Sequence, residues 1–117
     1  MRVIAKTAVT QAIKKHNQWG AALTLWLVTF DRPSLRYESF EKLRDTWSTT
    51  SGWNVDRIPH SNLKTTSKKG PLDIYVFDIK KNECRIIAWI NTLNGTIYIK
   101  EILPHAAYDK WWRSEVK

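Results

Sequence analysis

The feature that most constrains this chain is a run of strand-like sequence that begins at Tyr75 and ends in a helix-like segment at Trp112. It reads YVFDIKKNECRIIAWIN, then GTIYIKEILPHAAYDKWW. Asn94-Gly95 lies between two of these strands and is a strong signal for a two-residue type I′ hairpin turn. Such a turn predicts three cross-strand pairs: Asn91 with Tyr98, Trp89 with Lys100, and Ile87 with Ile102.

This predicted register gives the hairpin one polar and one apolar face, because side chains alternate along a strand. The polar face carries Arg85, Trp89, Asn91, Tyr98 and Lys100. The opposite face carries Ile86, Ala88, Ile90, Ile97, Ile99 and Leu103, and it is apolar enough to pack under helices, with Glu101 as the exception. A turn over Lys80 to Glu83, centred on Lys81-Asn82, would place Asp78 opposite Arg85. Arg85 could then be half of a cross-strand ion pair.

The N-terminal half has helical periodicity instead. Residues 2 to 5 alternate and predict an edge strand, after which Thr7 can cap a helix that Gly20 ends. A second helix carries Leu23, Trp26, Leu27 and Phe30 and is closed by Pro33, so the two helices predict an antiparallel hairpin. In the first of these helices, the positions with apolar helical spacing are Val9, Ala12, Ile13 and His16.

A third, short helix follows, with Ser39 as its cap and Phe40, Leu43 and Trp47 on one face. From Ser48 to Pro71 the sequence is polar and rich in turn formers, which predicts a long loop that could hold one strand around 53–58. Together these elements predict one α+β domain over residues 1–117.

Charge and cysteine content bound the function. Nineteen Lys and Arg against eleven Asp and Glu give a net charge of +8, which favours RNA, DNA or an acidic protein as partner, although excess lysine can also simply keep a protein soluble. Cys84 stands alone, so no disulfide is expected. The chain shows neither a signal peptide nor a membrane span, and we expect a cytoplasmic protein without membrane partners.

The closing helix carries the candidate chemistry. Pro104 suits its first turn, and His105, Tyr108 and Trp112 then fall on one side, with Asp109 four residues after His105. An imidazole and a phenol on one face can transfer protons and bind a phosphate. The alternative is purely structural: Tyr108 and the tryptophans dock the helix on the sheet, and His105 lies at the surface.

The runs VFDIKKNECRIIAWIN and IYIKEILPHAAYDK resemble the HigB family of toxins from type II toxin-antitoxin modules, whose members typically read like VFNIGGNKYRLIA and then IRFVLTHAEYDK. MRVIAKTAV and the helical hairpin look similar too. The resemblance implies a RelE-like α+β fold, with an N-terminal helical hairpin packed on a small, mostly antiparallel sheet and a C-terminal helix. It also implies an mRNA interferase that acts on ribosome-associated messages and is controlled by a helix-turn-helix antitoxin of the HigA type.

Matching positions are Asn82, Arg85, Ala88, His105, Tyr108, Asp109 and Lys110. Three departures stand out: Lys80-Lys81 replaces paired glycines, Asp78 replaces an asparagine, and Pro104 and Ala107 replace the threonine and glutamate around the histidine. Lysine tolerates positive φ poorly, so the turn could be reshaped. None of these changes removes a ring nitrogen, a phenol or a guanidinium.

The implied reaction is metal-free RNA cleavage, in which the ribose 2′-hydroxyl attacks the adjacent phosphate. We expect His105 and Tyr108 to transfer protons and Arg85 and Lys100 to hold phosphate. Lys80, Lys81, Asn82 and Lys110 are assigned to binding the RNA backbone. No metal or other cofactor is expected, since the three histidines share no ligand-like spacing. The alternative is a non-catalytic RNA- or protein-binding module, or a degenerate toxin that only binds its antitoxin.

Overall fold

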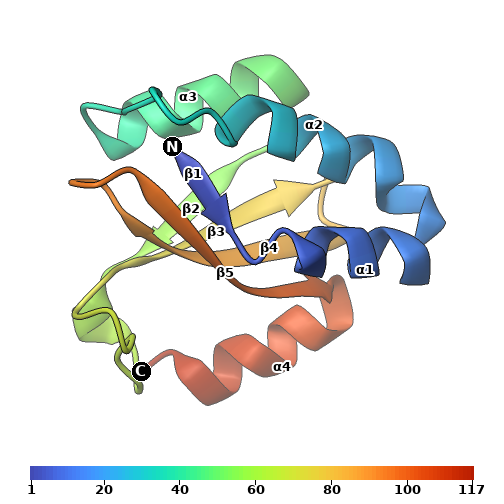
Figure 1. The fold of residues 1–117 in the computed structure, drawn as a ribbon. Helices are drawn as coiled ribbons and strands as arrows, with labels where there is room; N and C mark the ends of the chain where they lie inside the picture. Colours follow the sequence, from blue (N-terminus) through green and yellow to red (C-terminus); the bar gives the residue numbers. More distant parts are fainter.

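The computed structural model describes all residues from 1 to 117 and contains one five-stranded sheet with helices on both faces (Figure 1). The strands are β1 (Arg2–Ile4), β2 (Val55–Ile58), β3 (Ile74–Ile79), β4 (Cys84–Asn91) and β5 (Thr96–Pro104). Their order across the sheet is β1-β5-β4-β3-β2. All neighbours pair antiparallel except β1 with β5, which are parallel. The α+β fold class and the RelE-like arrangement expected from the sequence are confirmed.

Three helices cover one face of the sheet and the fourth covers the other. They are α1 (Thr7–Lys15), α2 (Gly20–Phe30), α3 (Phe40–Ser51) and α4 (His105–Glu115). The α1–α3 side encloses a core cluster of 19 buried residues. A second cluster of six buried residues lies under α4 and includes Trp111. None of the helices combines the length and apolar character needed to cross a lipid bilayer.

The N-terminal helices follow the predicted periodicity but not the predicted ends. Lys6, not Thr7, is the N-cap residue of α1, and no side chain caps this helix. Gly20 does not end α1, because the short 3₁₀ helix η1 (Asn17–Trp19) makes the break and Gly20 is the first residue of α2. α2 ends at Phe30, three residues before Pro33. Figure 1 shows α2 running back above α1, as a helical hairpin requires.

The segment after residue 38 is more regular than predicted. Ser39 does cap α3, where its hydroxyl accepts a hydrogen bond of 3.3 Å from the backbone N–H of Lys42. The helix then continues to Ser51, and Gly52 ends it with φ of 84°. Residues 48–51 are therefore helical and not part of the loop. The strand expected around 53–58 is β2, and a second 3₁₀ helix, η2 (His60–Asn62), follows it.

Next to its loop, the β4–β5 hairpin differs from the predicted register by two residues. Asn91 pairs with Thr96 and Trp89 with Tyr98, so the loop is the four residues from Thr92 to Gly95. Only Gly95 has positive φ there, at 68°, which excludes a type I′ turn at Asn94-Gly95. Oδ1 of the Asn91 side chain accepts hydrogen bonds from the backbone N–H groups of Leu93 and Asn94, and these bonds stabilise the longer loop.

A β-bulge in β5 explains why Glu101 did not fit the apolar face. Ala88 pairs with Ile99 but Ile87 pairs with Glu101, which leaves Lys100 as the extra residue. Beyond the bulge, side chains change faces. Ile102 packs against the large core and Leu103 against the cluster under α4, the reverse of the predicted arrangement.

Candidate active site

The candidate site lies where the β3–β4 loop meets the start of α4. The loop covers residues 80–83, since Ile79 pairs with Cys84 and Asp78 with Arg85. The backbone N–H of His105 donates a hydrogen bond of 3.1 Å to the carbonyl of Glu83. Pro104 is the N-cap residue of α4, one position earlier than predicted. This contact brings the first turn of α4 beside the loop and the root of β4.

The β3–β4 loop turns through two lysines with left-handed backbone conformation. Lys80 has φ of 51° and Lys81 has φ of 62°. The backbone N–H of Glu83 donates a 3.3 Å hydrogen bond to the carbonyl of Lys80, so Lys81 and Asn82 are the central residues of the turn, as predicted. Lys80 and Lys81 are the positions at which the HigB-like pattern has paired glycines. Residues with a Cβ atom are strained there. The loop therefore keeps the backbone shape that glycine favours and adds two cations to it.

Arg85 is held by partners on three sides. Its Nε atom lies 3.0 Å from Oδ1 of Asp78, and one terminal nitrogen donates a 2.7 Å hydrogen bond to the carbonyl of Asn82. Its Cζ atom lies 5.0 Å from the centre of the Tyr108 ring. The predicted cross-strand ion pair is thus present. Because a guanidinium has five N–H donors, this one retains several for an anion.

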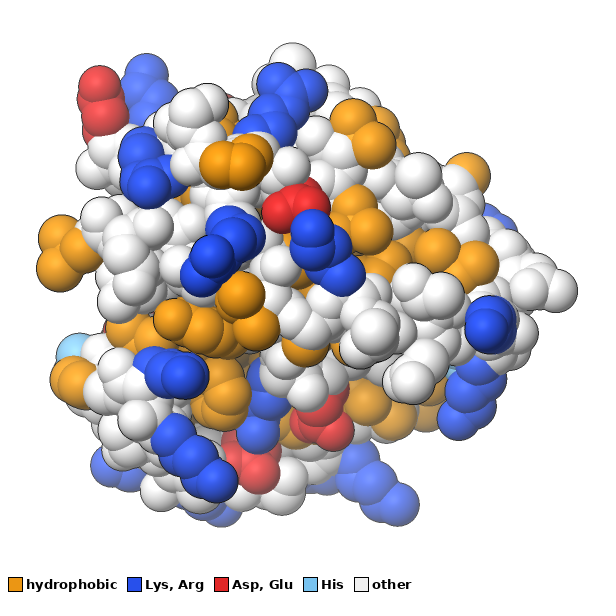
Figure 2. Space-filling view, in the orientation of Figure 1, with side chains coloured by type: hydrophobic (Ala, Val, Ile, Leu, Met, Phe, Trp, Pro, Cys, Tyr) orange, Lys and Arg blue, Asp and Glu red, His pale blue; other side chains and the backbone are white.

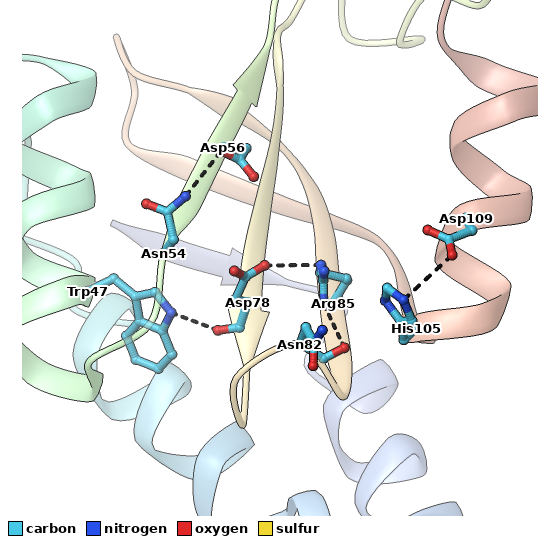
Figure 3. A network of polar contacts seen from close by, with 8 residues as sticks. All are labelled: Trp47, Asn54, Asp56, Asp78, Asn82, Arg85, His105 and Asp109. Carbon is cyan, nitrogen blue, oxygen red and sulfur yellow. Dashed lines mark hydrogen bonds and ion pairs between the residues drawn. The ribbon is translucent and has the colours of Figure 1, made fainter.

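Asp78 is the counter-charge to Arg85 (Figure 3). Burial raises the pKa of its carboxyl, an effect that Asp56 reinforces and the Arg85 guanidinium opposes. Its backbone carbonyl accepts a 2.9 Å hydrogen bond from the indole of Trp47 in α3. Asp78 therefore joins the candidate site on one face of the sheet to the large core on the other.

His105 and Asp109 form a pair on the first turns of α4. The Nε2 atom of His105 lies 3.6 Å from Oδ2 of Asp109, the i, i+4 contact expected from the sequence, and both side chains are half exposed. At this distance the pair is an ionic contact and not a hydrogen bond. Figure 3 shows Arg85 on β4 facing Asp78, and His105 at the start of α4 facing Asp109.

Tyr108 is half-buried between the sheet and two tryptophans. Its ring centroid lies 5.9 Å from that of Trp111 and 6.3 Å from that of Trp112. Burial raises the pKa of its phenol to about 12, even though Arg85 lowers it. The phenol is therefore protonated at neutral pH and can donate a proton or a hydrogen bond. Trp111 is buried and docks α4, whereas Trp112 is 43% exposed.

Two of the predicted residues lie outside this cluster. Lys100 lies with its Nζ atom 5.0 Å from the ring centre of Trp89. Trp89 is four residues from Arg85 along β4, or about 13 Å at the usual strand rise. Lys110 lines a separate hollow on α4 with Glu101, Leu103 and Trp111. The structure thus brings together Arg85, His105, Tyr108 and the loop residues Lys80, Lys81 and Asn82.

Sequence reasoning missed Asp56 as a neighbour of the site. Its carboxylate raises the pKa values of both Asp78 and Tyr108, and it accepts a 3.1 Å hydrogen bond from Asn54. The only available signal was the short β2 pattern Val55-Asp56-Arg57-Ile58, within a segment read mainly as loop. No group of three or more His, Cys, Asp or Glu side chains is arranged to hold a metal ion.

Comparison with known proteins bears on the segment that builds the cluster. Residues 60–111 match the HigB toxin family, described as the RelE-like toxic component of a toxin-antitoxin system. An mRNA interferase HigB of Escherichia coli O6:H1 (strain CFT073) is 46% identical over 39 residues, which are 33% of this chain and 38% of that relative. The match thus spans well under half of the relative's length. The residues that match the HigB toxin family include every candidate residue named from the sequence.

Proposed function

We propose that this protein is the toxin of a type II toxin-antitoxin pair and cleaves messenger RNA without a metal ion. One observation carries the proposal: the segment that resembles HigB toxins is the one that gathers Arg85, His105 and Tyr108 at the start of α4. The net charge of +8 suits a polyanionic substrate. We further propose that the substrate is mRNA on the ribosome, in the cytoplasm, and that a HigA-like helix-turn-helix antitoxin inhibits the toxin.

Arg85 binds the phosphate that is cut. Two of its donors are fixed by Asp78 and Asn82, so the guanidinium has one orientation and its remaining N–H groups can bind phosphate oxygens. As the 2′-oxygen attacks, negative charge grows on those oxygens. A fixed cation that is already in place stabilises this charge without reorganising.

His105 and Tyr108 move the protons. Because the Tyr108 phenol has a pKa of about 12, it suits the role of acid, which protonates the departing 5′-oxygen or donates a hydrogen bond to the phosphate. His105 then takes the proton of the 2′-hydroxyl. Asp109, 3.6 Å from Nε2, favours the tautomer with its proton on that nitrogen and leaves Nδ1 to act as the base.

The surrounding cations guide the RNA strand. Lys80, Lys81 and Asn82 lie on the loop beside Arg85 and contact the backbone next to the cut. Lys100, further along the same face, binds a flanking phosphate. Lys110, on another side of α4, adds to the general attraction for RNA.

The test is controlled expression of the protein without an antitoxin, combined with mapping of mRNA ends. We expect growth arrest and new ends inside coding regions, and neither with His105→Ala. A translating extract that receives purified protein should give the same ends. Growth arrest with intact messages would contradict the proposal and favour the non-catalytic binding module.

A further inference from the structure

We propose that Trp89 and Tyr98, together with Lys69 and Lys100, form a stacking site for bases of single-stranded RNA. This rests on the proposed function, because it extends the RNA path beyond the phosphate at Arg85. The two rings are direct cross-strand partners in β4 and β5, and both side chains are half-buried. A pair of aromatic faces at a sheet surface is the usual platform on which proteins stack RNA bases.

Each ring has a lysine above it. The Nζ atom of Lys100 lies 5.0 Å from the Trp89 ring centre, and that of Lys69 lies 5.7 Å from the Tyr98 ring centre. Neither ammonium forms an ion pair with a carboxylate. Both cations can therefore bind phosphate while a base replaces them over the ring.

Two irregular features of the chain hold these lysines in place. The β5 bulge makes Lys100 an extra residue between Ile99 and Glu101, and bulges near functional sites commonly redirect a side chain. A tight turn holds Lys69, in which Ser67 bridges to Gly70 and the Ser67 hydroxyl accepts the Lys69 N–H at 3.0 Å. The segment before this turn is fixed to the end of α4, since Leu63 bridges to Val116.

The stacking site lies on the same face of β4 as Arg85, and Trp89 is about 13 Å from Arg85 along the strand. A strand of RNA with one phosphate at Arg85 can thus place a neighbouring base on the aromatic pair. Figure 2 shows hydrophobic side chains flanked by Lys and Arg side chains on the face between the β4–β5 hairpin and α4. Since every base has a π-face, the site should accept RNA with little sequence preference.

The test measures binding of a single-stranded ten-nucleotide RNA that carries 2′-O-methyl groups and cannot be cleaved. Tyr98→Leu removes the aromatic face, and we expect about 5- to 150-fold weaker binding with an unchanged salt dependence. Tyr98→Phe should bind as the wild type does. Lys69→Gln should instead reduce the slope of log affinity against log salt by about 0.7, while Lys64→Gln, in the same segment but away from the rings, should leave it unchanged.

Wild-type protein with an abasic version of the same RNA gives a test that needs no substitution, and we expect a similar loss of affinity. If Tyr98→Leu and the abasic RNA both bind as tightly as their references while the wild type cleaves mRNA, the stacking site is wrong and the proposed function stands. If the wild type neither binds nor cleaves RNA, both proposals are wrong.

Discussion

The two faces of the sheet differ in how completely helices cover them. The face under α1–α3 is closed by a continuous apolar cluster, in which Phe30 contacts the rings of Trp26, Trp47 and Phe77 at centroid distances of 5.1–5.8 Å. The face under α4 has a small cluster and, beside it, Arg85, Asp78 and Tyr108 in a half-buried setting. Because α4 covers its face incompletely, burial shifts the pKa values of Asp78 and Tyr108 while both groups stay within reach of a substrate.

The strongest test of this contrast is a pair of Tyr→Phe substitutions, one on each face. Tyr108→Phe keeps the ring that packs on Trp111 but removes the phenol, and it should lower the cleavage rate by about 10² to 10⁴ with little change in stability. Tyr37→Phe, beside Phe30 on the other face, should leave the rate unchanged. The measurement is single-turnover cleavage together with denaturant unfolding. Equal rates in both variants would mean that the Tyr108 phenol has no part in the chemistry.

The loss of an aromatic ring should destabilise the protein more on the α1–α3 face than on the α4 face. Phe30 is fully buried, and Phe30→Ala should lower the free energy of unfolding by about 3–5 kcal/mol because it leaves a cavity. Trp112→Ala removes a larger ring from the α4 side, yet it should cost far less because Trp112 is 43% exposed. Urea unfolding of both variants is the measurement. A loss of similar size at Trp112 would show that α4 is docked more firmly than its contacts indicate.

The counter-charge of Arg85 can be removed by Asp78→Asn, which restores the residue of the HigB-like pattern. We expect about fivefold tighter RNA binding, since a carboxylate close to the guanidinium no longer opposes the phosphate. Because burial raises the pKa of Asp78, wild-type protein should gain the same advantage as the pH falls and the carboxyl becomes neutral. The two affinities should then converge at acid pH. Asp45→Asn, an exposed control on α3, should change neither affinity nor its pH dependence.

The smallest effect concerns the β3–β4 loop. Replacing Lys80 and Lys81 together with glycine should raise the free energy of unfolding by about 1 kcal/mol, because relief of two positive φ angles outweighs the greater freedom of glycine in the unfolded chain. RNA binding should weaken as two cations are lost. The matched control is the double alanine variant, which loses the same charges but keeps the strain. If it gains as much stability as the glycine variant, charge repulsion and not backbone strain is the cause.

What could be predicted from the sequence was the part set by local periodicity. The Asp78–Arg85 pair, the polar face of β4 and the His105–Asp109 contact follow from strand and helix spacing, and the structure confirms all three. The register of β5 could not be predicted, because Asn94-Gly95 fits a two-residue turn equally well. In an alternating sequence, the only sign of a bulge is a residue that does not fit the alternation. Here that residue was Glu101, the one charged residue on the predicted apolar face.

The geometry of the candidate site could not be predicted from residue spacing, because it depends on contacts between segments that are far apart in the sequence. The distance between Arg85 and Tyr108 depends on how α4 docks, and docking depends on Trp111 and on the cluster beneath it. The raised pKa of Tyr108 reflects burial, which only packing determines.

The parallel pairing of β1 with β5 has a consequence for synthesis of the protein. Arg2, Val3 and Ile4 pair with Thr96, Ile97 and Tyr98, so β1 has no partner strand until β5 has been synthesised. Contacts between segments this far apart in sequence form slowly and late in folding. Since β5 also leads directly into α4, a nascent chain cannot assemble the proposed active site before both β5 and α4 have left the ribosome.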